Sequence, residues 1–323
     1  MPQQSPNRFA PLTFLAVAAF ALAACGGGDA VPAEGGGDGG DTMAAGQQAV
    51  SLFGEALFQQ DDTTGAIAEA DEALAADPDN VDLIVAAGRV RRNFWQYRQA
   101  MELYSRAIEL APEDWRAHRF RGHRHISVRE FDAAIADLET ARDLAPMNWD
   151  VAYHLGLAYF LAGRFGDAHE EYRRCLDLAG DAEAEAAEAD GFRSCSVNAD
   201  DVESFVAMTE WAVRAAARAG DDAEVQRLLD TVSTDLDVSE NVAYYHDLLY
   251  YKGEMTADEL LNPGPDAPYR METVGFGVAN WMLAKGDTAE AREILESLME
   301  DPWWPGFGRV AAEVELYRLT QGG

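Results

Sequence analysis

The sequence is poor in positive charge. Its 323 residues contain 25 Lys and Arg against 57 Asp and Glu, which gives a formal net charge of −32. Because nucleic-acid-binding domains are usually basic, this balance argues against nucleic acid as a ligand. It favours a soluble surface on which like charges repel one another. Apolar residues make up 48% of the chain, enough for a sizeable core in one large domain or two ordinary ones.

Motifs that carry catalysis or bind metals are also absent from the sequence. It has no nucleophile motif, no phosphate-binding loop and no zinc-protease helix signature. His118 and His125 stand seven residues apart, but His123 points away from them, and no Cys or carboxylate stands at ligand spacing. We therefore expect no catalytic residue, no metal and no cofactor, and interpret the protein as a non-enzyme.

A candidate lipid-attachment sequence ends the apolar N-terminal segment. Arg8 is followed by a run of apolar and small residues that is too short and too rich in alanine for a membrane span. The run has the length of a secretory signal core. Leu-Ala-Ala-Cys25 resembles the bacterial lipoprotein box, which implies a signal peptide at residues 1–24 and a lipid on Cys25. The alternative is an ordinary signal peptide that is cleaved near Ala24.

The residues that follow Cys25 form a predicted tether. Residues 25–46 are rich in glycine and are expected to be flexible, which lets a lipid-anchored domain stand away from a membrane. In the lipoproteins that this segment resembles, the residue after the cysteine influences sorting. Gly26 implies the outer membrane, with the protein facing the periplasm. In a host with one membrane, the same lipid would hold the protein at the outer face of the cell membrane.

Cys175 and Cys195 are the two remaining cysteines. The compartment that the signal segment implies is oxidising, which favours a disulfide between them. The alternative is a buried Cys175 in a slot otherwise filled by alanine, with Cys195 as a free thiol. Both interpretations are open at the level of the sequence.

Beyond the tether, the sequence repeats every 34 residues. The residues in phase are Pro78, Pro112 and Pro146; Gly54, Gly88, Gly122 and Gly156; Ala66, Ala100, Ala134 and Ala168; and Ala73, Ala107 and Ala141, with Cys175 in the fourth copy. Small residues let two helices approach closely, and proline stops the second helix because it has no N–H to donate. The period and the residue types resemble the tetratricopeptide repeat. The resemblance implies helix pairs at residues 47–80, 81–114, 115–148 and 149–182.

The rest of the chain follows this pattern less regularly. Residues 183–201 are predicted to form an acidic insertion loop. Residues 202–323 contain degenerate helical hairpins, in which Gly220, Gly253 and Gly286 stand 33 residues apart and mark turns between paired helices. A last helix is expected to cap the array with a polar outer face. The expected fold class is all-α, a tetratricopeptide superhelix of four clear repeats, degenerate C-terminal hairpins and a capping helix.

The third repeat opens with a basic helix, WRAHRFRGHRHI at residues 115–126. In the family that it resembles, the first helix of each repeat lines a concave groove that binds peptide segments. The resemblance places in this groove Arg89, Arg92, Arg116, Arg119, His123 and Tyr153. Arginine donates paired hydrogen bonds to carboxylates. The expected partner is therefore an extended segment of an envelope protein that is acidic or ends in a free carboxylate.

His118, Arg121 and His125 share another face of this helix, at spacings of three and four residues. The family usually has apolar residues there, and a buried charge is costly unless it is paired. Asp137 or Glu102 would neutralise Arg121. Two interpretations are open for these residues: a structural polar cluster and a functional pocket.

Two classes of function are compatible with the sequence. The first is a lipid-anchored, non-catalytic scaffold that binds an envelope protein in the concave groove. The second is an envelope binding protein for a small anionic ligand or a glycan, which would use the polar cluster or the aromatic rings of Trp303 and Trp304.

Overall fold

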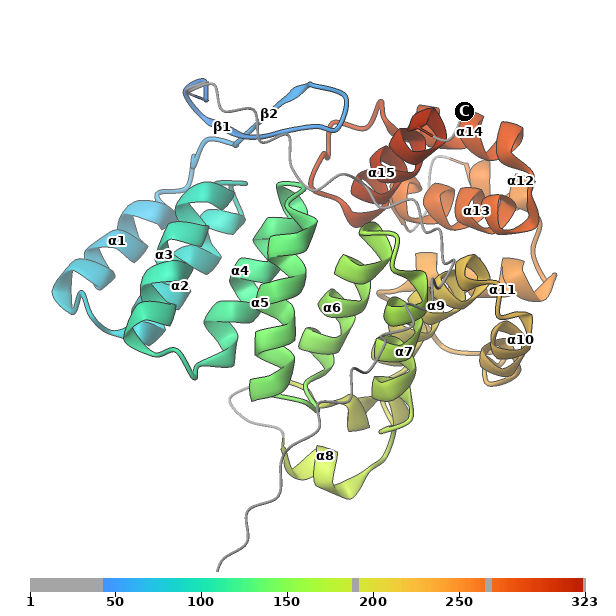
Figure 1. The fold of residues 1–323 in the computed structure, drawn as a ribbon, viewed down its shortest axis with the longest axis horizontal. Coiled ribbons are helices and arrows are strands. Elements are labelled where there is room, and N and C mark those ends of the chain that lie inside the picture. Colours follow the sequence, from blue (N-terminus) through green and yellow to red (C-terminus); the bar gives the residue numbers. More distant parts are fainter. Residues whose placement is uncertain (1–42, 188–191, 265–268, 322–323) are drawn as a thin grey trace, which may run out of the picture.

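The computed structural model describes residues 43–187, 192–264 and 269–321. In this part of the chain, fifteen α-helices follow two short strands, and successive helices form hairpins that lie side by side (Figure 1). The predicted fold class is therefore confirmed. The predicted signal peptide 1–24, Cys25 and most of the tether lie outside the described residues. None of the described helices is both long enough and apolar enough to span a membrane.

Three complete hairpins form the regular part of the fold. They are α2 (Val81–Arg92) with α3 (Tyr97–Leu110), α4 (Trp115–Ser127) with α5 (Phe131–Leu144), and α6 (Trp149–Leu161) with α7 (Phe165–Leu176). Each first helix begins after a side chain that accepts a hydrogen bond from a backbone N–H of the first turn: Asn80, Asp114 and Asn148. These caps recur with the 34-residue period, so the same local signal starts each hairpin.

The phased glycines let the two helices of a hairpin touch. A Cβ atom at Gly88 would lie 2.5 Å from the ring of Tyr104, and one at Gly156 would lie 2.5 Å from the ring of Tyr172. Such a contact is far shorter than van der Waals packing allows, so any larger residue would push the helices apart.

The first predicted repeat, residues 47–80, is wrong in its first half. It contains β1 (Gln47–Val50) and β2 (Ala56–Phe58), which pair antiparallel, and only the second helix is present, as α1 (Ala66–Ala76). Gly54 stands in the turn between the strands with a φ of 86°, a left-handed conformation that a helix does not contain. The phased glycine therefore serves a strand turn here and a helix contact in the other repeats.

Residues far away in the sequence hold this strand pair in place. Ala49 and Leu57 are buried in one apolar cluster with Tyr97, Val128 and Trp304. The indole Nε1 of Trp304 also donates a 3.0 Å hydrogen bond to the backbone carbonyl at residue 58 in β2. The 34-residue period carries no information about such partners, which is why it predicts a helix.

The C-terminal half consists of shorter and less regular elements. They are α8 (Ala182–Ala186), a 3-10 helix (Cys195–Ala199), α9 (Val202–Ala219), α10 (Asp222–Asp230), α11 (Val242–Lys252), α12 (Ala257–Leu261), α13 (Met271–Lys285), α14 (Thr288–Leu298) and α15 (Phe307–Gln321). Helices α9, α11 and α13 end at Gly220, Gly253 and Gly286, with φ of 77°, 80° and 92°. These left-handed positions favour glycine, and they are the inter-helix turns that the sequence predicts.

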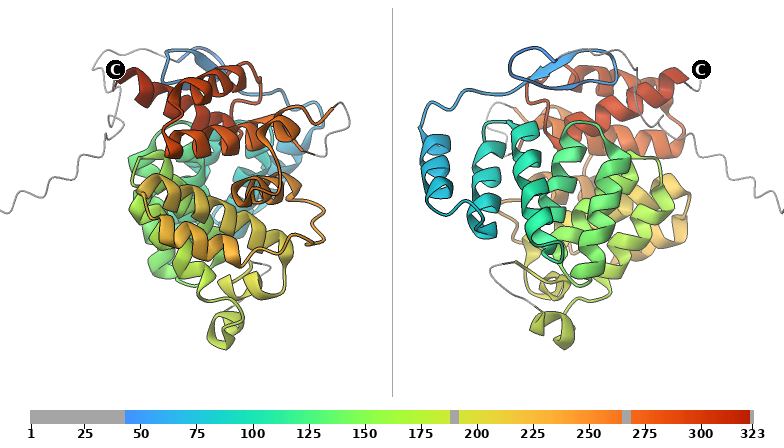
Figure 2. Two further views of the ribbon diagram at one scale, coloured as in Figure 1. Left: turned by 90° about the vertical axis from the view of Figure 1, so that its right-hand side faces the viewer. Right: turned by 60° about the vertical axis from the view of Figure 1, so that its left-hand side comes forward.

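The last helix, α15, packs on α13 and α14 and also comes close to the loop between the N-terminal strands (Figures 1 and 2). The backbone N–H of Leu52 donates a 2.7 Å hydrogen bond to the carboxylate of Glu313. Arg129, in the turn between α4 and α5, forms an ion pair with the same carboxylate at 2.7 Å. The expected polar outer face is not found, because residues 308–316 of α15 are all buried. The two ends of the array are therefore in contact.

Candidate functional site

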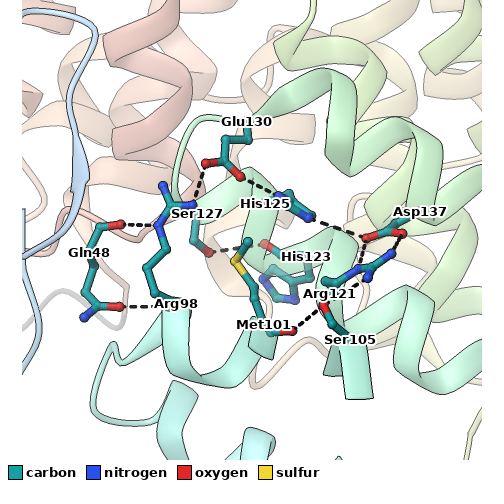
Figure 3. A network of polar contacts seen from close by, with 10 residues as sticks. All are labelled: Gln48, Arg98, Met101, Ser105, Arg121, His123, His125, Ser127, Glu130 and Asp137. Atoms are coloured by element: carbon teal, nitrogen blue, oxygen red, sulfur yellow. Dashed lines mark hydrogen bonds and ion pairs between the residues drawn. The ribbon is translucent and has the colours of Figure 1, made fainter. Parts of the chain in front are cut away.

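The polar cluster predicted on α4 is centred on Asp137 of α5 (Figure 3). Arg121 donates two hydrogen bonds to this carboxylate, at 2.7 and 2.6 Å. His118 and His125 lie 3.7 and 3.6 Å from it. Asp137 is therefore the acid that neutralises Arg121, whereas Glu102 is exposed to solvent.

A second set of contacts joins this cluster to the N-terminal strands (Figure 3). The Nδ1 atom of His125 lies 2.6 Å from Glu130, and Glu130 accepts a 2.6 Å hydrogen bond from Arg98. Arg98 also donates to the backbone carbonyl of Gln48 in β1 at 2.9 Å. Burial raises the pKa of Glu130, but hydrogen bonds and charge from His125 and Arg98 outweigh it, so the pKa is lowered. Because each arginine and carboxylate here has a partner, the geometry favours the structural interpretation of the cluster.

The first helices differ in how much of the concave side they expose. On α2, Arg89 is exposed and Arg92 is half-buried. On α4, Arg119 retains only 6% of its surface, and on α6, Tyr153 also retains 6%. The predicted groove is therefore accessible at α2 and covered at α4 and α6.

The C-terminal end of the chain covers part of this side. The ring of Phe307, at the start of α15, lies 5.1 Å from the ring of His123 and 6.4 Å from that of Tyr153. Arg318 donates a 2.6 Å hydrogen bond to the backbone carbonyl of Leu161 at the end of α6. The prediction that His123 and Tyr153 line an open groove is therefore wrong, because the protein's own C-terminal segment occupies that position.

Two further predicted groove residues have partners within the chain. Arg116 lies 2.6 Å from Asp114 and 2.8 Å from Asp82. Arg119 lies 2.8 Å from Asp150. Among the described residues, no carboxylate forms an ion pair with Arg89 or Arg92, the other two arginines of the predicted set, and the Nε atom of Arg92 is buried without a hydrogen-bond partner.

The acidic insertion reaches the same side of the molecule. The ring of Phe192 lies 4.8 Å from Trp115 and 6.2 Å from Phe120, both on α4. A disulfide between Cys175 and Cys195 ties this segment to α7. Of the two interpretations of these cysteines, the structure contains the bonded one.

Two residues of this region, Arg124 and Tyr104, are not predicted from the sequence. Arg124 is 5% exposed, and its guanidinium carbon lies 4.8 Å from the centre of the Tyr97 ring. Tyr104 is fully buried, and its hydroxyl has no hydrogen-bond partner. Burial lowers the pKa of Arg124 to about 10, which leaves the side chain charged at neutral pH. One signal in the sequence was available: a 13-residue helix with four arginines and no acid cannot turn every arginine to solvent once it is packed.

His123 and His154 lie beside these arginines, with ring centres 4.2 Å apart. Burial lowers the pKa of both side chains, and that of His154 falls to about 3. Both imidazoles are therefore neutral at physiological pH and add no charge to the region.

A second group of buried charges, here named the acid cluster, consists of Glu210, Arg214 and Asp247. All three are fully buried between α9 and α11. Arg214 donates a 2.9 Å hydrogen bond to Asp247 and forms an ion pair with Glu210, which also accepts a 2.8 Å hydrogen bond from Tyr251. Burial raises the pKa of Glu210 to about 7 and that of Asp247 well above its ordinary value. Two carboxylates therefore share one guanidinium.

No group of three or more His, Cys, Asp and Glu side chains in the described part of the chain is placed to hold a metal ion.

Comparisons with known proteins agree with the repeat fold. Residues 121–183 match the family model described as tetratricopeptide repeat. A stretch of 94 residues is 32% identical to Small glutamine-rich tetratricopeptide repeat-containing protein 2 of Saccharomyces cerevisiae, over 29% of this chain and 27% of the yeast protein. The match therefore covers little more than a quarter of the yeast protein.

Among solved structures, the fold is similar to that of a tetratricopeptide repeat protein from Parabacteroides merdae. The TM-score is 0.50 at 13% identity, over 80% of this chain and 93% of that one. MamA gives a TM-score of 0.40 at 20% identity, over 59% of this chain and 88% of that one. At these identities the similarity concerns the fold alone. The protein is thus an all-α array of tetratricopeptide-like hairpins, and residues 121–183 carry the family's sequence pattern.

Proposed function

We propose that the protein is a non-catalytic scaffold that binds a protein partner on the exposed side of α2. One observation carries this proposal: α2 leaves its concave side open, whereas the chain's own C-terminal segment and insertion cover the equivalent sides of α4 and α6. Binding of peptide segments is what the repeat family implies. A partner that approaches the concave side therefore meets α2.

The exposed side of α2 is a continuous helical face. Asp82, Ala86 and Arg89 are exposed along it, at spacings of four and three residues. Arg89 supplies a charge without an ion-pair partner among the described residues, so an acidic partner segment is favoured.

A photo-crosslinking residue placed at Ala86 tests this surface. We expect it to capture one discrete protein in membranes of the native host. The same residue at Leu144, which is 38% exposed at the end of α5, is the matched control and should capture none. Absence of a product at residue 86, or the same products at both positions, would contradict the proposed surface.

We further propose that a lipid on Cys25 holds the scaffold at the outer membrane, facing the periplasm. Leu-Ala-Ala-Cys25 and the glycine-rich segment after it support this location, and a disulfide between Cys175 and Cys195 suits an oxidising compartment. Cys25→Ser should release the protein from membranes, because it removes the acyl chains on which stable anchoring depends. Its thermal unfolding should not change. A variant that still sediments with membranes in high salt would exclude the lipid anchor.

A further inference from the structure

Helices α2 and α4 gather four arginines around the side chains of Phe120 and Tyr104. We name Arg89, Arg92, Arg119 and Arg124 the arginine cluster. The guanidinium carbons of Arg89 and Arg119 lie 5.4 and 4.7 Å from the centre of the Phe120 ring. The ring of Tyr104 stacks on Phe120 at 5.7 Å.

The pKa of the Tyr104 hydroxyl reflects the charge of the whole arginine cluster. Burial raises its pKa, and the charges of all four members of the arginine cluster act against that rise. Together with the positions of Arg89 and Arg119 over the Phe120 ring and of Arg124 over the Tyr97 ring, this describes one region of positive charge.

The arginine cluster contains more positive charge than its surroundings neutralise. Asp150, 2.8 Å from Arg119, is the one carboxylate among the described residues that forms an ion pair with any member. Burial lowers the pKa of Arg124, and the charges of Arg92 and Arg119 act in the same direction. A buried charge without a counter-charge is strongly destabilising, and among the described residues Asp150 is one carboxylate against four arginines.

Three buried donors in this region also lack a hydrogen-bond acceptor. The Nε atoms of Arg92 and Arg119 and the hydroxyl of Tyr104 are buried without a partner. All three can donate a hydrogen bond, and the guanidinium nitrogens can do nothing else. A ligand that completes this site must therefore be negative and carry several acceptor atoms.

We propose that the arginine cluster binds one oxoanion, a carboxylate or a phosphate group, between Arg92, Arg124 and the hydroxyl of Tyr104. Guanidinium groups match the geometry of both anions. Arg89 is exposed and Arg92 is half-buried, so the arginine cluster reaches the surface at α2. The site goes beyond the proposed scaffold function, because it holds an anion whether that group is free or belongs to a protein.

The test uses the detergent-solubilised full-length protein at constant ionic strength. Inorganic phosphate, a short peptide with a free C-terminal carboxylate, and the same peptide as an amide are titrated by calorimetry, and thermal melts are recorded with each. We expect phosphate or the free-acid peptide, and not the amide, to bind at one site per chain and to raise the melting temperature.

Two variants locate the site. Arg92→Gln and Arg124→Gln should each weaken binding by about tenfold or more, since each removes a charged donor from a desolvated ion. Arg92 is half-buried, so its variant carries the test if Arg124→Gln fails to fold. Arg106→Gln is the matched control, because it removes an equal charge from a surface pair with Asp79, and it should bind as wild type does.

The pattern of binding then separates the sources of the anion. Tighter binding of the free-acid peptide assigns the site to the end of a protein segment, and binding of phosphate alone assigns it to a small anion. Either result supports an oxoanion site. A chloride titration gives the non-specific response to an anion. If no probe binds more tightly than chloride does, or if Arg106→Gln weakens binding as much as the two cluster variants do, the proposal is overturned.

Discussion

The arginine cluster and the acid cluster each contain more charge of one sign than of the other, but they differ in how the excess can be neutralised. In the acid cluster, Glu210 and Asp247 face one guanidinium, and burial raises the pKa of both carboxyls, that of Glu210 to about 7, so Glu210 can hold a proton near neutral pH. In the arginine cluster, the pKa of Arg124 falls only to about 10. An acid can lose its charge within the cell's pH range, and an arginine cannot. Excess negative charge is therefore relieved from inside the fold, whereas excess positive charge requires a ligand.

The largest effect we expect is from Arg214→Met in the acid cluster. The substitution leaves Glu210 and Asp247 buried without a cation, which typically costs about 3–5 kcal/mol. Urea unfolding followed by circular dichroism at pH 7 measures this loss. Arg227→Met is the control from the same half of the protein. Its ion pair with Glu224 is largely exposed on the arginine side, so it should change stability by about 0.5 kcal/mol or less. Similar losses in the two variants would show that the acid cluster does not depend on its guanidinium.

The acid cluster should also respond to pH. Burial raises the pKa of Glu210 from an ordinary 4.5 to about 7, against the opposing effects of Arg214 and Tyr251. Between these values the folded protein keeps a proton that the unfolded chain has released, so the contribution of Glu210 to the free energy of unfolding increases as pH falls. Asp247 acts in the same direction. We expect the stability of wild type relative to Glu210→Gln to rise between pH 7.5 and pH 5.5.

The histidines beside the arginine cluster act in the opposite direction. His123 and His154 have a lowered pKa, so the unfolded chain takes up protons below about pH 6.5 that the folded protein does not. Their effect is common to wild type and to Glu210→Gln, and it cancels when the two are compared. A stability difference that stays constant over this range would mean that Glu210 is not the protonated group.

Loss of the disulfide between Cys175 and Cys195 should affect the region of the arginine cluster and not that of the acid cluster. Cys175 and Cys195 close a loop with a sequence separation of 20, and loss of such a loop constraint costs about 3 kcal/mol in the chain-entropy model. The double variant Cys175→Ala/Cys195→Ala should lose this stability in urea unfolding and should no longer respond to a reductant. Because Phe192 lies against Trp115 and Phe120, hydrogen exchange should increase in α4 and remain unchanged in α11. Two free thiols in the denatured, unreduced protein, counted at these positions, would exclude the bond.

The sequence predicts those parts of the molecule that depend on near neighbours in the chain. Gly88 and Tyr104 belong to one repeat, and the caps of α2, α4 and α6 lie beside the helices that they start. The pairing of Arg121 with Asp137 spans 16 residues, and helical periodicity indicates the face on which each lies. The glycine contacts and the caps recur with the period, so the period predicts them. The pairing of Arg121 with Asp137 belongs to one repeat, and only the helical spacing indicates it.

The closure of the array could not be predicted in this way. Arg129 and Glu313 are 184 residues apart, and neither side chain belongs to the repeated pattern. Phe307, which covers His123, and Trp304, which is hydrogen-bonded to β2, also lie far along the chain from their partners and outside the repeated pattern. Arg124 escaped prediction for a related reason: its surroundings come from Tyr97 and Tyr104 of the preceding hairpin, and the period gives their spacing but not the space between them.

The smallest effect is the one that separates the two clusters most sharply. Arg124→Met keeps the volume of the side chain and removes a buried charge that no carboxylate neutralises. In buffer without phosphate or carboxylates we expect it to stabilise the protein, by about 1 kcal/mol, because hydrophobic replacement of buried ions is often favourable. Arg214→Met has the opposite sign, since there the guanidinium is the neutralising group. Adding phosphate should raise the stability of wild type by mass action and leave Arg124→Met unchanged, so the order of the two proteins reverses. If Arg124→Met instead destabilises the protein in anion-free buffer as much as Arg214→Met does, Arg124 already has a counter-charge within the chain, and the two clusters are alike.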